Sequence, residues 1–183
     1  GLAGLCLALQ LREKFADLDI VVLERSTHPL PGAALKVGES KVEIGAHYLA
    51  ETLGLRAHLD SAHIRKFGFR FFWSDGRSDL QGVTELGVGR VLPTPTWQID
   101  RGILENHLGQ LLHDRGVGFL DGSVVRGIEI GEGDAEHLID ITTAGEERRL
   151  SARWVVDASG RAGLLRRKLD LTENNGHDAN AVW

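Results

Sequence analysis

Two glycines, Gly1 and Gly4, stand three residues apart at the front of an apolar helical pattern that runs to about Lys14. An apolar run over Ile20–Leu23 then ends on Glu24, roughly 20 residues after the second glycine. In the G-x-G-x-x-G fingerprint, the second and third glycines have this spacing, backbone approaches a pyrophosphate at the helix N-terminus, and a later carboxylate binds a ribose. The pattern predicts the back half of a dinucleotide-binding βαβ unit. An ordinary helix–strand pair with a surface glutamate is the alternative.

The same segment supplies the first candidate binding residues. We expect Gly1 and Gly4 to lie at a pyrophosphate, and Glu24, followed by Arg25, to lie at a ribose. The first fingerprint glycine and the strand before it are absent, and the chain contains no methionine. We therefore expect the chain to be a piece of a longer protein, incomplete at both ends.

Composition restricts the class of protein. A net charge of −5 argues against a nucleic-acid surface, and 42% hydrophobic residues suit a globular domain. The single cysteine, Cys6, cannot form an internal disulfide and falls on the apolar side of the first helical pattern. We expect it to be a core residue in a reducing, cytoplasmic protein. No apolar run approaches the length of about 18 residues that spans a membrane, and the eight histidines show no zinc-site spacing, so we expect no metal site.

Hydrophobic periodicity predicts alternating helices and strands. The predicted helices are Leu2–Lys14, a segment around Val42–Leu53 that ends at Gly54, Arg101–Arg115 and Ala162–Leu169. The predicted strands are Ile20–Leu23, Phe67–Trp73, Gly118–Leu120, Val124–Ile130, His137–Thr143 and Arg153–Val156, and Gln81–Pro95 gives no clear prediction.

Four segments in order resemble the FAD-binding part of the flavoprotein monooxygenase and halogenase superfamily. They are Gly1–Gly4 with Glu24, Lys36-Val-Gly-Glu-Ser40, Trp97-Gln-Ile-Asp-Arg101, and Trp154-Val-Val-Asp-Ala-Ser-Gly-Arg161. The Val-Gly-Glu-Ser pattern is similar to a segment of the tryptophan-halogenase-like branch. The resemblance implies an α/β, Rossmann-like FAD-binding fold with a mainly parallel sheet and an antiparallel β insertion. It makes residues 1–183 a partial FAD-binding domain, in which residues 60–97 form a substrate-side β insertion.

The resemblance also implies further residues at the cofactor, which would be FAD. Ser40 can in addition cap the following helix, and Asp157 can orient the amides of its loop. The alternative for these positions is an ordinary turn, cap or helix start. The implied FAD-binding positions are Gly38, Ser40, Gln98, Arg101, Val125 through its backbone, Asp157 and Gly160.

One lysine is the catalytic candidate. In flavin-dependent halogenases, oxidised halide passes to a lysine shortly before an aromatic strand residue, and the segment Ile64–Trp73 resembles that region. Lys66 takes the position of the lysine, or Arg65 if the alignment shifts by one residue. An ordinary exposed lysine at a strand start is the alternative. Many halogenases have a proline soon after Val-Gly-Glu, where this chain has Lys41 and the residues after it.

Three functions follow from these patterns. The first is an FAD-dependent oxidoreductase of the halogenase or monooxygenase type. It would act through reduced flavin and O2 on an aromatic or other small organic substrate, with a separate flavin reductase supplying FADH2. The second is a flavin reductase of the geranylgeranyl-reductase type, and the third is a non-catalytic flavin-binding module. We expect the isolated 183 residues to hold FAD poorly and to be inactive alone.

Overall fold

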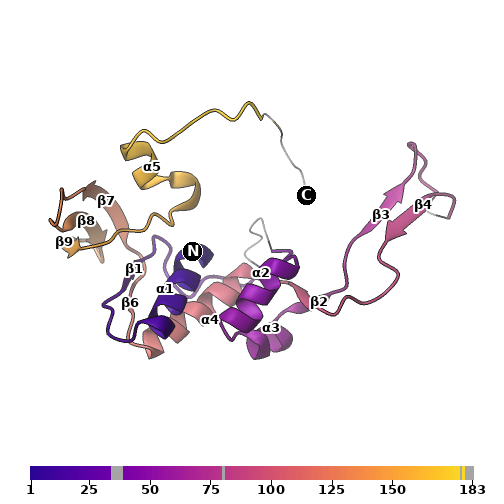
Figure 1. The fold of residues 1–183 in the computed structure, drawn as a ribbon, viewed down its shortest axis with the longest axis horizontal. Helices are drawn as coiled ribbons and strands as arrows, with labels where there is room; N and C mark the ends of the chain where they lie inside the picture. The colour runs from indigo at the N-terminus through magenta and orange to yellow at the C-terminus, as the bar shows by residue number, and fades with distance from the viewer. Residues whose placement is uncertain (34–38, 80, 178, 180–183) are drawn as a thin grey trace.

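The computed structural model describes residues 1–33, 39–79, 81–177 and 179 (Figure 1). The helices are α1 (Leu2–Lys14), α2 (Glu43–His47), the π-helix η1 (Tyr48–Thr52), α3 (Arg56–Ala62), α4 (Arg101–Asp114), the 3-10 helix η2 (Gly160–Ala162) and α5 (Leu164–Lys168). The strands are β1 (Val21–Leu23), β2 (Ile64–Lys66), β3 (Arg70–Trp73), β4 (Thr84–Gly87), β5 (Thr96–Gln98), β6 (Gly118–Leu120), β7 (Val124–Glu129), β8 (His137–Thr143) and β9 (Glu146–Ala152).

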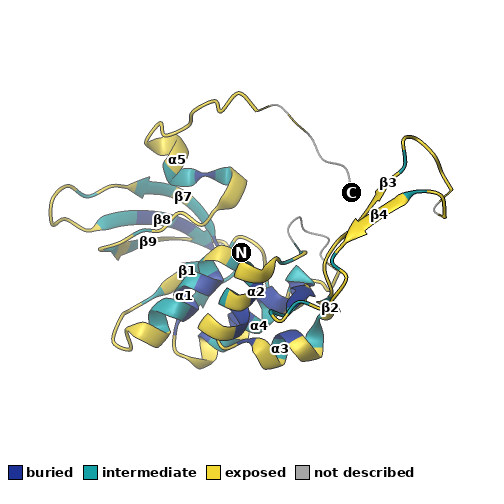
Figure 2. Cartoon of the chain, turned by 45° about the vertical axis from the view of Figure 1, so that its right-hand side comes forward, coloured by how far each residue is buried: buried dark blue, intermediate teal, exposed yellow. Residues whose placement is uncertain are grey.

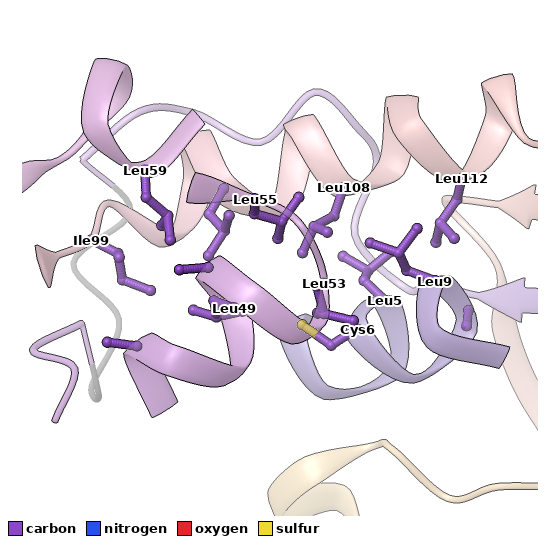
Figure 3. Packing of buried hydrophobic residues seen from close by; sticks show 14 of the residues in the cluster. Leu5, Cys6, Leu9, Leu49, Leu53, Leu55, Leu59, Ile99, Leu108 and Leu112 are labelled. Atoms are coloured by element: carbon purple, nitrogen blue, oxygen red, sulfur yellow. The ribbon is translucent and has the colours of Figure 1, made fainter. Parts of the chain in front are cut away.

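A helical core forms the centre of the molecule (Figure 3). Leu5 and Leu9 of α1 are spaced one helical turn apart, as are Leu108 and Leu112 of α4, so each helix presents an apolar stripe to the other. All four side chains are fully buried. Each contributes about 1.5–3 kcal/mol through removal of its apolar surface from water. The α2–η1 segment and α3 close the core on its other side.

The start of α4 is fixed by local hydrogen bonds. Asp100 caps the helix by accepting a hydrogen bond from the N–H of Ile103 at 3.1 Å. Gly102 lies against the carbonyl oxygen of Pro31, where an added Cβ would come within 2.1 Å. The helix start therefore has a fixed place beside the loop that precedes the Val-Gly-Glu-Ser segment.

The strands of the described residues form four small sheets. Strands β1 and β6 pair in parallel, whereas β2 pairs with β5, β3 with β4, and β7, β8 and β9 with one another in antiparallel order. Within the described residues, the parallel part of the fold is therefore the β1–β6 pair. The sheet of β7, β8 and β9 lies on the opposite side of the helical core from the β3–β4 hairpin (Figure 1).

The β3–β4 hairpin projects away from the helical core (Figure 2). Every residue of both strands is exposed, including Phe71, Phe72 and Trp73 of β3. After β3 the chain turns at Asp75 and Gly76, which both adopt positive φ. Between Ile64 and Gln98 the chain forms the two antiparallel pairs β2–β5 and β3–β4.

Several predicted elements are confirmed. The helix Leu2–Lys14 and the strands Gly118–Leu120 and His137–Thr143 have the predicted bounds. The predicted helix Arg101–Arg115 ends one residue earlier. Gly54 adopts φ of 64° after η1, as a helix-terminating glycine does.

Two predictions need correction. The run Arg153–Val156 is not a strand, and Trp154 is 81% exposed, because no strand of the described chain pairs with it. An apolar run makes a buried strand only where a neighbour takes up its backbone hydrogen bonds. The helix predicted around Val42–Leu53 changes to a π-helix at Tyr48, where the N–H of Leu53 bonds to the carbonyl of that residue. No helix in the described ranges is long and apolar enough to cross a membrane.

Candidate functional site

Gly1 and Glu24, two residues of the predicted fingerprint, lie next to each other in the structure. The Glu24 carboxylate, directly after β1, pairs with the amino group of Gly1 and accepts a hydrogen bond from the N–H of Ser26 at 2.8 Å. Burial acts to raise the pKa of Glu24, but the hydrogen bonds from Gly1 and Ser26 outweigh it and lower that pKa. A half-buried, ionised carboxylate therefore lies at the N-terminus of α1.

Gly4, the third glycine of the predicted fingerprint, lies against the loop that follows residue 156. A Cβ on Gly4 would lie 3.3 Å from the Cβ of Ala158, so the first turn of α1 and this loop approach closely. Asp157 accepts hydrogen bonds from the N–H groups of Ser159 at 3.0 Å and Leu165 at 2.8 Å, as predicted for a residue that orders its loop. Gly160 adopts φ of 63° and has open space around its Cβ position.

The start of β7 runs past the strand end that carries Glu24. The N–H of Ser123 donates to the carbonyl of Glu24 at 2.9 Å, and the N–H of Gly122 donates to the carbonyl of Ser26 at 3.3 Å. Val125 follows in β7 opposite Ile141. The backbone before Val125 is thus beside the predicted ribose-binding position, while Arg25 is exposed.

A cavity of about 430 Å³ opens along α1. One wall is apolar and comes from α1, and two cationic side chains, Lys41 and Arg101, face it from other segments. Burial raises the pKa of the Cys6 thiol to about 11, so the thiol on this wall stays protonated. The lining residues are Leu2, Ala3, Cys6, Leu7, Lys41, Gly45, Tyr48, Leu49 and Arg101.

Arg101 is held rigidly at the start of α4. Its side chain bonds to the buried Glu105 carboxylate through Nε at 3.0 Å and through a terminal nitrogen at 2.5 Å. Its backbone N–H points to the carboxylate of Glu39 at 3.5 Å, and Glu39 in turn accepts from the N–H of Ile99 at 2.8 Å. The Glu39–Ser40 end of the Val-Gly-Glu-Ser segment is thereby joined to the α4 start; Gly38 lies outside the described residues.

Ser40, Gln98 and Lys66 also come together. Ser40 forms an antiparallel bridge with Gln98 of β5, and Gln98 pairs with Ile64 of β2. The Nζ atom of Lys66 donates to Ser40 Oγ at 2.9 Å and to the carbonyl of Lys41 at 2.7 Å. The predicted catalytic lysine is therefore hydrogen-bonded to the segment predicted to lie near the flavin.

The geometry around Lys66 tests the helix-capping role expected of Ser40 and separates Lys66 from its alternative, Arg65. The helix-capping role expected of Ser40 is wrong, because α2 begins after Val42 without a side-chain cap and the Ser40 hydroxyl instead accepts from Lys66. Arg65, the alternative to Lys66, pairs with Asp60 at 3.6 Å and lies over the Trp97 ring at 5.5 Å. Neighbouring strand residues point to opposite faces, so only Lys66 faces the Ser40 segment.

The sequence analysis did not predict that Lys41 and Tyr48 line this cavity. The available signal was the position of Lys41, directly after the Val-Gly-Glu-Ser segment. Within the described part of the chain, no group of three or more His, Cys, Asp or Glu side chains is arranged to hold a metal ion.

Comparisons with known proteins give flavin-dependent halogenases as similar proteins. No family model matches the chain. A flavin-dependent halogenase, chlA of Dictyostelium discoideum, is 28% identical over 182 residues, which cover 88% of this chain and 30% of that protein. The crystal structure of CmlS, a flavin-dependent halogenase, matches with a TM-score of 0.73 at 21% identity over 93% of this chain and 30% of that one. The structure of halogenase PltM with phloroglucinol and FAD matches with a TM-score of 0.74 at 18% identity, over 96% of this chain and 36% of that one.

The chain has the fold of the FAD-dependent halogenases and monooxygenases. The resemblance inferred from the four sequence segments is thus confirmed. The chain spans about a third of the length of these relatives, from 30% to 36%.

Proposed function

We propose that this chain is the FAD-binding part of an FAD-dependent oxidoreductase of the halogenase or monooxygenase type. The cavity of about 430 Å³ along α1 carries the proposal, because it combines an apolar wall with cationic side chains beside the fingerprint helix. A flat apolar ring system joined to phosphates has the same two properties. The residues present therefore fit FAD.

Each part of the cofactor has candidate residues. Glu24 accepts hydrogen bonds from the adenosine ribose, and the N-terminal turn of α1 with Gly1 and Gly4 receives the pyrophosphate. The backbone around Val125 lies beside the adenine. The remaining contacts come from Ser40, Gln98, Arg101, Asp157 and Gly160, with Arg25 at the edge of the ribose site.

When bound and reduced, FAD supplies together with O2 the oxidising power of the reaction. Lys66 is the residue of this chain that acts on the substrate side. Its Nζ is fixed by Ser40 Oγ and the carbonyl of Lys41, and it lies 4.6 Å from the centre of the Phe69 ring. A fixed ammonium of this kind holds hypohalous acid by hydrogen bonding next to an aromatic substrate.

Residues 60–97 form the substrate side of the domain in this proposal. Their hairpin exposes Phe71, Phe72 and Trp73, an apolar surface that suits an aromatic or other small organic substrate. A separate flavin reductase supplies FADH2.

Replacing Lys66 tests the halogenase assignment. In the protein at its full natural length, we expect Lys66→Ala to abolish halogenated product while FADH2 oxidation continues, because the lysine acts after the oxidation. Lys14→Ala, which removes an exposed lysine at the far end of α1, serves as the control. Equal halogenation by Lys66→Ala and wild type would remove Lys66 from the mechanism, and loss of halogenation in Arg65→Ala alone would move the role to that residue.

Oxygen uptake separates the wider alternatives. A halogenase or monooxygenase consumes O2 in the presence of reduced flavin, and hydroxylated product without halogenation identifies the monooxygenase. Reduction of a prenyl chain without O2 uptake would instead assign a reductase of the geranylgeranyl type. A flavin-loaded protein that turns over no substrate would be a binding module.

A further inference from the structure

The cavity along α1 holds a positive charge that its own walls do not neutralise. None of its lining residues is an aspartate or a glutamate, whereas Lys41 and Arg101 both face it. Arg101 has the Glu105 carboxylate at 2.5 Å. For Lys41, no ion pair with a carboxylate occurs within the described ranges.

The surroundings of Lys41 make its charge costly. Burial, followed by the nearby charge of Arg101, lowers the pKa of Lys41. The opposing influence comes from Cys6, whose thiol is protonated at neutral pH because burial raises its pKa to about 11. A half-buried ammonium beside a guanidinium is stabilised when an anion enters between them.

The part of the cavity wall that α1 supplies favours an anion as well. Leu2 and Ala3, in the first turn of the 13-residue helix α1, line the same cavity as Lys41. The amides of such a turn carry partial positive charge and accept phosphate groups. Lys41 and the N-terminal turn of α1 thus line the same cavity, and both favour a bound anion.

The two lysines near the Val-Gly-Glu-Ser segment have different surroundings. Lys66 Nζ is engaged by Ser40 Oγ and by the carbonyl of Lys41, so its head lies at the backbone of this segment. The Lys41 side chain lines the large cavity, which does not include Lys66 among its walls. One lysine is therefore available to the cavity ligand and the other is not.

We propose that Lys41 binds a phosphate group of the dinucleotide in this cavity. The inference rests on the proposed function, since the dinucleotide is FAD. It adds a second cation to Arg101 and assigns a ligand-binding role to the residue that directly follows the Val-Gly-Glu-Ser segment.

Binding measurements with matched variants test the inference. We expect Lys41→Met, which keeps the length of the side chain, to raise the Kd for FAD roughly ten- to hundredfold, from the loss of a charge-assisted hydrogen bond. Lys41→Arg should restore most of the affinity. Lys14→Met, which removes an exposed lysine at the far end of α1, is the control and should bind FAD as wild type does. Riboflavin, which lacks phosphate, should bind Lys41→Met and wild type equally.

Chemical labelling gives a readout that does not depend on enzyme activity. In limited acetylation followed by peptide mass spectrometry, Lys41 should react at lower pH than Lys14, and inorganic pyrophosphate or FAD should protect Lys41 but not Lys14. Equal FAD affinity of wild type and Lys41→Met would overturn the inference. Equal weakening of riboflavin and FAD binding, or protection by chloride but not by pyrophosphate, would overturn it too.

The same experiments separate this inference from the proposed function. Wild-type protein that binds no FAD, while pyrophosphate still protects Lys41, would remove the FAD proposal and keep the phosphate site. Wild-type protein that binds FAD tightly, with no protection of Lys41, would keep the FAD proposal and remove the phosphate site at Lys41.

Discussion

The helical core and the β3–β4 hairpin use apolar residues in opposite ways. In the core, Leu9 of α1 and Leu108 of α4 are fully buried against each other's helices. In the hairpin, Phe71 is 60% exposed and Trp73 is 70% exposed. The core therefore gains its stability within the chain, whereas the hairpin presents large apolar side chains to whatever lies beside it. The cavity proposed for FAD borders the first region and the substrate proposed for Lys66 belongs to the second.

The largest difference between the two regions should come from the buried ion pair of the core. Glu105 is 1% exposed and its partner Arg101 is 21% exposed. Glu105→Ala leaves the guanidinium without this partner, and we expect a loss of about 3–5 kcal/mol in the free energy of unfolding. Urea denaturation measures it. Glu85→Ala breaks the exposed pair of the hairpin with Arg70, 3.0 Å apart, and should cost under about 1 kcal/mol. Equal losses in the two variants would contradict a core ion pair.

Truncation of apolar side chains sharpens the same comparison. Leu108→Ala should lower the free energy of unfolding by about 2–5 kcal/mol, because it leaves a cavity between α1 and α4. Phe71→Ala in the hairpin should change it by less than about 0.5 kcal/mol. Denaturant titration of both variants measures the two free energies of unfolding. A hairpin variant as destabilised as the core variant would show that the hairpin is covered by another part of the protein.

Replacing Glu24 at the proposed ribose site should weaken FAD binding without lowering the stability of the fold. Glu24→Ala is expected to weaken FAD binding by roughly 1.5–3 kcal/mol through loss of a charge-assisted hydrogen bond, while the helices remain folded. Fluorescence titration of FAD gives the affinity, and circular dichroism checks the fold. Unchanged affinity would make Glu24 a strand-end residue that only holds the Gly1 and Ser26 nitrogens.

A smaller effect should appear in the pH dependence of the stability of the helical core. The rings of His58 and His107 stack at 3.8 Å, and His63 lies 5.2 Å from His58. Burial, followed by the charges of His107 and His63, lowers the pKa of His58 from 6.5 to about 4. The fold therefore favours neutral His58, and its contribution to stability is complete above pH 6.5 and decreases as the pH falls towards 4.

The His58 prediction is checked by thermal melts between pH 4 and pH 7. His58→Gln should show a shallower loss of Tm over this window than wild type, whereas His113→Gln, with an exposed ring, should follow wild type. Parallel curves for wild type and His58→Gln would contradict a buried neutral histidine.

Local patterns were sufficient for some elements because their residues determine the structure by themselves. The helix Leu2–Lys14 has an apolar stripe of core residues, and Gly145 forms the turn after His137–Thr143 with the positive φ that glycine tolerates. Arg153–Val156 shows the limit. The apolar composition predicted a strand, but strand formation depends on a pairing partner that composition does not contain.

The candidate site shows the same limit. Glu24 is predicted to bind the ribose because its distance from Gly4 along the chain is characteristic of the fingerprint, and this role stays a prediction. The position of Lys41 on the cavity wall was not predicted, because the cavity forms where α1 and the start of α4 approach each other, which no local pattern encodes. Ser40 was assigned to the correct segment but to the wrong partner, since β2 brings Lys66 to its hydroxyl.

The central claim is that the cavity along α1 binds FAD as the tight cofactor, and the visible spectrum of the purified protein tests it most directly. At its full natural length, the protein should show flavin absorbance bands or acquire them on addition of one equivalent of FAD, with NAD binding far more weakly. A fully folded, colourless protein that cannot be reconstituted with FAD would contradict the account.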